Sequence, residues 1–252
     1  MSLDSKRGAK IHGRAEILDT PGALAARAAA LIAELMEGCE APFRLCLSGG
    51  STPRAAYTLL AKRNDIAWDC VEIFFGDERM VPPDHPDSNY RMVRETLLQG
   101  GTAGATVRPR LLLPMPTDGV PEACAEAYEE ILRQQYGASR LDPDVPLFDL
   151  TLLGLGADGH TASLIPGQPV LKERMHWVAA VPEGRPEVRL TLTYPALESS
   201  RLTLFLAAGA DKREAVARVR AGEADLPAGA LNPSGEVIWL LDRAAAGKGG
   251  GG

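Results

Sequence analysis

One segment of this 252-residue chain constrains its fold more than any other. The largely apolar run 148–155 is typical of a strand buried on both faces of a parallel sheet. A glycine-rich turn follows it and carries Asp158 and His160 two residues apart. We expect residues 161–163 to form a helical turn that Pro166 ends. Open α/β sheets place their chemistry at the carboxyl ends of such strands, so this carboxylate and imidazole are the first candidates for an active site.

Strand and helix patterns alternate along most of the remaining chain. The predicted strands are 15–19, 44–47, 71–75, 111–113, 177–181, 189–194, 202–208 and 237–241, and the predicted helices are 23–36, 54–62, 89–98, 120–136 and 212–220. Thr20, Ser88 and Asp211 are the expected helix caps. The alternation predicts one α/β domain over residues 15–243. It should hold a mainly parallel sheet with helices on both faces and some antiparallel pairing in the C-terminal half, between flexible termini at 1–14 and 244–252.

Composition excludes several classes of protein. The net charge of −6 argues against a general nucleic-acid binder, so clusters of Lys and Arg are interpreted as local anion sites. The four cysteines lack CxxC spacing, which predicts reduced, mostly buried thiols in a cytoplasmic protein. No apolar stretch approaches the roughly 18 residues of a membrane span, and no signal peptide is recognisable.

The loop 48–53, Ser-Gly-Gly-Ser-Thr-Pro, joins a predicted strand to a helix and has the features of a phosphate-binding turn. Gly49 and Gly50 allow close approach of the backbone, Ser51 and Thr52 offer hydroxyls, and the helix amino terminus presents free N–H groups. The ending of a Walker loop is absent. An ordinary tight turn with a Ser or Thr cap is an equally good interpretation.

Two further groups of charges follow predicted strands. Lys212 and Arg213 stand where a helix begins, a position that disfavours cations unless an anion is bound. We interpret Lys212 as a candidate anion ligand and Arg213 as solvated. Asp77 to Arg79 is either a solvated charge run or a site in which Arg79 binds an anion and Asp77 orients it.

His160 is the strongest candidate for catalysis. The surrounding segment 154–159 matches GxGxxG, but Pro166 cuts the following helix short, so a dinucleotide site is not expected. None of the four histidines has a partner at metal-ligand spacing, and we predict no metal and no cofactor. An imidazole with an ordinary pKa of about 6.5 suits a general base near neutral pH.

Five segments taken together resemble the 6-phosphogluconolactonase family. They are LSGGSTP at 47–53, GDERMVPPDHPDSNYR at 76–91, LGLGADGHTASLIPG at 153–167, RLTLTYPAL at 189–197 and GADKREAV at 209–216. The resemblance implies a single Rossmann-like domain that binds no nucleotide. It implies hydrolysis of 6-phospho-D-glucono-1,5-lactone to 6-phosphogluconate in the oxidative pentose phosphate pathway. The expected protein is a cytoplasmic hydrolase without cofactor, a monomer or a weak homo-oligomer, with a small sugar phosphate as its partner.

The resemblance also assigns roles to residues. His160 becomes the general base that activates water, and the residues associated with the phosphorylated sugar become Gly49, Gly50, Ser51, Arg79, Arg189 and Lys212. Which of the cations contacts the phosphate and which the lactone carbonyl stays open. The related glucosamine-6-phosphate deaminases carry a Glu five residues after the histidine, where this chain has Ile165.

Two other functions fit part of the pattern. A serine hydrolase with Ser51 as nucleophile would lack the G-x-S-x-G elbow. A sugar-phosphate sensor would keep the anion-binding residues and would have no use for His160. Detection of turnover separates the sensor from the enzymes.

Overall fold

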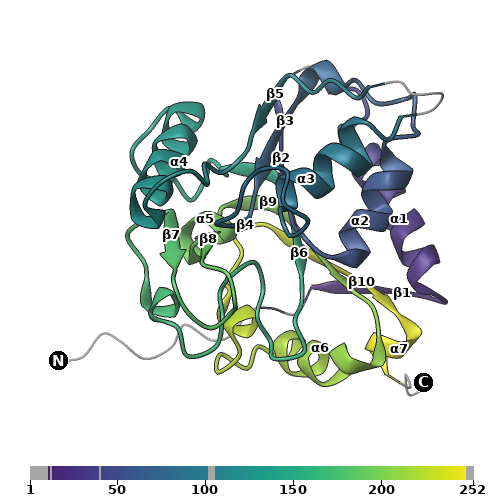
Figure 1. The fold of residues 1–252 in the computed structure, drawn as a ribbon. Helices are drawn as coiled ribbons and strands as arrows, with labels where there is room; N and C mark the ends of the chain where they lie inside the picture. The colour runs from purple at the N-terminus through teal and green to yellow at the C-terminus, as the bar shows by residue number, and fades with distance from the viewer. Residues whose placement is uncertain (1–10, 12, 40, 102–105, 248–252) are drawn as a thin grey trace.

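A computed structural model describes residues 11, 13–39, 41–101 and 106–247 of the chain (Figure 1). Its main sheet has seven strands, all paired in parallel, in the order β1-β10-β9-β6-β2-β3-β5. The strands are β1 (Arg14–Leu18), β2 (Phe43–Leu47), β3 (Val71–Phe75), β5 (Leu111–Leu113), β6 (Phe148–Gly154), β9 (Ser200–Ala207) and β10 (Glu236–Asp242). The segment expected as the central buried strand is β6, which pairs with β2 and β9 on its two sides.

Helices cover this sheet, as the alternating pattern predicts. They are α1 (Pro21–Met36), α2 (Ser51–Leu60), α3 (Asn89–Val93), α4 (Pro121–Tyr136), α5 (Tyr194–Glu198), α6 (Arg213–Arg220) and α7 (Arg243–Ala246). In Figure 1, α1 and α2 lie to one side of the sheet and α6 to the other. The interior strands are apolar because both of their faces are covered, and Leu150, Leu152 and Leu153 of β6 have no exposed surface.

A second sheet has three antiparallel strands in the order β4-β8-β7. Two of them, β7 (Val178–Val181) and β8 (Arg189–Leu192), confirm the antiparallel pairing expected in the C-terminal half. The third, β4 (Asp77–Arg79), comes from the N-terminal half and was not expected as a strand. Its three charged residues have low strand propensity, and pairing with β8 overrides that preference.

Several local predictions were confirmed and others were wrong. Thr20 and Ser88 cap their helices, each accepting a hydrogen bond from a backbone N–H of the first turn. Asp211 caps no helix, because a 3-10 turn intervenes, α6 begins two residues later, and the carboxylate pairs with Lys212 at 3.0 Å instead. Residues 161–163 form no helical turn, since Ala162 adopts a left-handed φ of 47°.

The packed structure extends beyond the limits of 15 and 243 that the sequence suggested. Ile11 is fully buried, and Ala245 of α7 is buried as well. The other predicted terminal residues, 1–10, 12 and 248–252, lie outside the described residues. All four cysteines are free thiols, of which Cys46 and Cys124 are buried. Within the described part of the chain, no helix combines the length and the apolar character needed to cross a membrane.

Candidate active site

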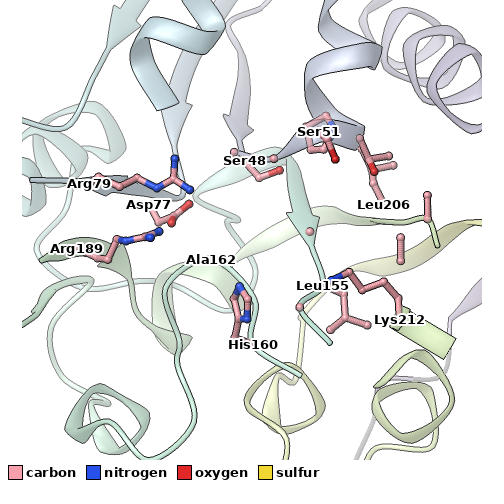
Figure 2. Close-up of a pocket in the computed structure, with 18 residues that line it drawn as sticks. Ser48, Ser51, Asp77, Arg79, Leu155, His160, Ala162, Arg189, Leu206 and Lys212 are labelled. Carbon is pink, nitrogen blue, oxygen red and sulfur yellow. The ribbon is translucent and has the colours of Figure 1, made fainter. Parts of the chain in front are cut away.

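A cleft of about 260 Å³ opens at the carboxyl ends of β2, β6 and β9 (Figure 2). Its walls include nine of the ten site residues expected from the sequence, and Asp158, the tenth, contacts one of them. The nine are Gly49, Gly50, Ser51, Thr52, Asp77, Arg79, His160, Arg189 and Lys212. Parallel strands end at one edge of the sheet, so residues that follow different strands meet there.

The turn after β2 presents the free amino terminus of α2 to the cleft. Gly50 is the cap residue of this helix with a φ of 110°, and no side chain caps the helix. The backbone N–H groups of Ser51 and Thr52 therefore have no partner within the helix. The Ser or Thr cap of the alternative interpretation is absent from this turn. An uncapped helix terminus of this kind can accept an anion, and phosphate binding here stays a prediction.

His160 lines the cleft, and its Nδ1 atom has polar neighbours. Asp158 Oδ1 is 2.5 Å from Nδ1, and the guanidinium of Arg185 donates to the other carboxylate oxygen at 2.7 Å. Burial by itself would raise the pKa of Asp158, but the hydrogen bonds from Arg185 and His160 hold that pKa well below its ordinary value. The carboxylate thus stays ionised. It favours a proton on Nδ1, which would leave Nε2 free to accept one, whereas Arg185 Nη2, 3.1 Å from the same Nδ1, is a competing donor.

Glycine is required at two positions of the turn that carries this pair. A Cβ on Gly156 would lie 2.0 Å from His160 Nδ1, so the imidazole packs directly against the bare backbone. Gly159 has a φ of 78°, and a Cβ there would lie 2.8 Å from Leu226. The carbonyl of Gly159 also accepts a hydrogen bond from the Ala228 N–H at 2.9 Å. The chain segment after α6 therefore packs against this turn and stabilises it.

Arg79 and Arg189 face each other across the ladder between β4 and β8. Like charges directly opposite on neighbouring strands repel. Burial lowers the pKa of Arg189, and the positive charge of Arg79 lowers it further. An anion placed between the two guanidinium groups would remove this repulsion, so the pair favours anion binding at this end of the cleft.

The sequence suggested that Asp77 orients Arg79 directly, but each side chain hydrogen-bonds to other groups. Its Oδ2 accepts from the Ser163 hydroxyl at 2.7 Å, and its Oδ1 accepts from Asn89 Nδ2 at 3.3 Å. Arg79 instead donates to the carbonyl of Asp87 and, at 3.0 Å, to Asn89 Oδ1. Among the described residues no hydrogen bond or ion pair joins Asp77 to Arg79, so Asn89 is the link between them.

Lys212 lies at the other end of the cleft in the view of Figure 2, near Leu155. It is the residue that precedes α6, and its ammonium group pairs with Asp211. The cleft therefore has cations at both ends and the imidazole between them. Arg213 is exposed and donates to the carbonyl of Ala244 at 3.2 Å, away from the cleft.

Sequence reasoning missed several residues of the site. Ser48, Leu155, Ala162 and Leu206 also line the cleft, and Asn89, Ser163 and Arg185 contact its predicted residues. Ser163 lies in the same segment as His160, and that position was an available signal. Neither Arg185 nor Asn89 had a local signal. Arg185 lies on a loop, 27 residues from Asp158, and Asn89 begins α3, 10 and 12 residues from Arg79 and Asp77.

No cluster of three His, Cys, Asp or Glu side chains that could hold a metal ion exists in the described residues. That a reaction at this site needs no metal and no cofactor stays a prediction. The groups available for chemistry are one imidazole with an ionised carboxylate, three cations, and the N–H groups of two turns.

Comparison with known proteins agrees with this arrangement. The family profile described as glucosamine-6-phosphate isomerases/6-phosphogluconolactonase matches residues 19–239. The 6-phosphogluconolactonase of Synechocystis sp. is 42% identical over 207 residues, covering 80% of this chain and 82% of the relative. That of Nostoc sp. is 37% identical over 238 residues, covering 91% and 95%. The solved 6-phosphogluconolactonase of Trypanosoma cruzi superposes with a TM-score of 0.80 at 28% identity, covering 98% of this chain and 100% of the other.

Proposed function

The chain belongs to the glucosamine-6-phosphate isomerase/6-phosphogluconolactonase family, and from that premise we propose that it hydrolyses 6-phospho-D-glucono-1,5-lactone to 6-phosphogluconate. The observation that carries the proposal is the position of His160 and its contact with Asp158. Its Nδ1 is engaged by the ionised Asp158, and its ring lines a cleft with cations at both ends. One such base suffices for attack by water on a reactive ester.

The proposed reaction begins with His160 Nε2, which accepts a proton from a water molecule as that water attacks the lactone carbonyl. Positive charge then develops on the imidazole, and Asp158 stabilises it through Nδ1. The carbonyl oxygen becomes negative and needs fixed donors, which N–H groups of the glycine turns or a guanidinium can supply. Collapse of the tetrahedral intermediate opens the ring, and the proton returns to the leaving oxygen.

The cations orient the substrate in this proposal. A doubly charged phosphate far from the reacting carbonyl binds between charged groups and fixes the lactone relative to His160. Arg189 and Lys212 are proposed to serve the phosphate. The half-buried Arg79–Arg189 pair supports this assignment for Arg189, because an anion there relieves a repulsion that the unliganded protein contains.

Deamination of glucosamine 6-phosphate is the nearest alternative. It moves protons between adjacent carbons and needs a second acid–base group beside the histidine. The position expected for that group is Ile165, an apolar residue that is 3% exposed. A serine-hydrolase mechanism has less support, since none of the described contacts joins Ser51 to His160. A sensor would not require the ordered pair of Asp158 and His160.

The test is to incubate the purified protein with each substrate. We expect proton release from fresh 6-phosphogluconolactone well above its spontaneous rate and no ammonia from glucosamine 6-phosphate. Ammonia formation without lactone hydrolysis would place the chain in the deaminase branch, and binding of the sugar phosphate without turnover would favour the sensor. A cytoplasmic location and a monomeric or weakly associated state stay predictions.

A further inference from the structure

Asn89 is a buried residue outside the cleft that contacts three of the residues that line it. Its side chain is at the start of α3 and is 2% exposed. Nδ2 donates to the carbonyl of Asp77 at 2.9 Å and to its carboxylate at 3.3 Å, while Oδ1 accepts from Arg79 Nη1 at 3.0 Å. A Cβ on Gly49 would lie 2.1 Å from Oδ1. The amide therefore touches Asp77 and Arg79 of β4 and Gly49 of the turn 48–53 at once.

The backbone of Asn89 is held as firmly as its side chain. The buried carboxylate of Glu78 accepts from the N–H groups of Asn89 and Tyr90, each at 2.8 Å, and from the hydroxyl of Ser88 at 3.2 Å. Burial raises the pKa of Glu78, while the N–H groups of Asn89, Tyr90 and Arg79 lower it. The first turn of α3 is thus fixed to β4, and the amide has little freedom to move.

The position requires a side chain that both donates and accepts. Asp77 needs a donor on its free oxygen, since Ser163 occupies the other one, and Arg79 needs an acceptor. An amide supplies both, whereas a carboxylate supplies none of the donors. With Asn89 between them, Arg79 and Asp77 form no direct ion pair among the described residues.

We propose that Asn89 is a positioning residue that holds the Arg79 guanidinium at the cleft and keeps it from pairing with Asp77, so that its charge is available to an anionic substrate. This inference rests on the proposed function for its kinetic test. It also makes a prediction about binding alone, because an Arg79 that turns towards Asp77 loses affinity for an anionic sugar acid phosphate whether or not turnover occurs.

A double-mutant cycle with Arg79 tests the inference. Asn89→Ala should lower kcat/KM for 6-phosphogluconolactone about 10- to 100-fold, the range expected when a binding group is misplaced. In the Arg79→Ala background the same change should cost at most about 3-fold, because the residue acts through the missing guanidinium. A role in folding alone predicts similar losses in both backgrounds, and that outcome would overturn the inference.

The near-isosteric variant Asn89→Asp separates hydrogen bonding from space filling. It keeps the acceptor for Arg79, loses both donors, and sets a carboxylate against Asp77 and Glu78 of β4 with Arg79 and Arg189 close by. We expect it to be no more active than Asn89→Ala. Near-normal kcat/KM in this variant would show that the amide donors have no role, and would overturn the inference even if Asn89→Ala did not fold.

Two controls complete the design. Ser199→Ala removes the hydroxyl that accepts a buried hydrogen bond from the Leu147 N–H at the opposite end of β6, and it should lower stability without changing kcat/KM. Calorimetry with 6-phosphogluconate gives a readout independent of turnover, in which Asn89→Ala should bind about 10-fold more weakly. Unchanged affinity refutes the role of Asn89, whereas weakened binding in a protein that hydrolyses no lactone supports it and refutes the proposed function alone.

Discussion

Replacement of Arg189 by methionine should stabilise the unliganded protein and lower its affinity for the substrate. The Arg189 side chain is 14% exposed and lies directly opposite Arg79. Its Nε atom is buried with no hydrogen-bond partner in the described residues. Its nearest carboxylate, Glu187, is 3.4 Å away and itself 30% exposed. Arg189→Met keeps the length and the apolar packing of the stem and removes the charge.

The size of each effect follows from this geometry. Like charges opposite each other across two strands cost up to about 1 kcal/mol, and Asp77 and Glu187 offset part of this, so the variant should gain at most about that much stability. For a domain of this size 1 kcal/mol corresponds to a rise in Tm of about 2 to 4 °C. Loss of hydrogen bonds between a guanidinium and a phosphate costs about 1.5 to 3 kcal/mol, which raises KM about 10- to 150-fold.

Thermal melts and kinetics measured on one set of proteins test both halves of this prediction. The matched control is Arg201→Met, which removes an exposed arginine at the other end of β9 that pairs with Asp149. Saturating 6-phosphogluconate should raise the Tm of the wild type and of the control much more than that of Arg189→Met, because the stabilisation grows with the ratio of ligand concentration to Kd. A variant with a lower Tm and an unchanged KM would refute the reasoning, since Arg189 would then be a structural cation.

Three further predictions concern the chemistry. His160→Ala should lower kcat by about two to four orders of magnitude with a smaller effect on binding of 6-phosphogluconate, and near-normal kcat in a folded variant would remove His160 from the mechanism. Lys212→Ala should raise KM for the phosphorylated lactone and leave the slow hydrolysis of unphosphorylated gluconolactone nearly unchanged; equal losses on both would place Lys212 at the reacting carbonyl. Exhaustive chelation should leave activity intact, and activity that returns only with one metal ion would contradict a cofactor-free reaction.

The location of the site could be predicted from the sequence because it depends on local signals. Each of the segments 48–52, 155–160 and 208–212 follows an apolar strand run, and glycines mark the turns. Parallel strands that share a sheet bring such turns to one edge. The prediction of a helical turn at 161–163 was wrong, because Ala162 occupies a left-handed conformation that its side chain does not favour.

The resemblance to a family added roles that composition and spacing could not supply. It selected Arg189 among 27 Lys and Arg residues, whereas Lys212 was already a candidate from its place at the start of a helix. It did not select Asn89, although the matching segment 76–91 contains it. An amide in a polar stretch gives no local sign that it will be buried, so its importance appears only where its contacts are known.

By itself the sequence determined the buried parallel strands, the helices between them and the turns at which the reactive groups stand, because apolar runs, helix caps and glycines act over a few residues. Only the tertiary structure decided which side chains meet. Arg79 came to face Arg189 because a charged triplet without strand propensity joined the second sheet. Arg185 reached Asp158 across 27 residues, and Ser163 reached Asp77 across 86. Such contacts depend on the packing of whole elements, which no short stretch of sequence encodes.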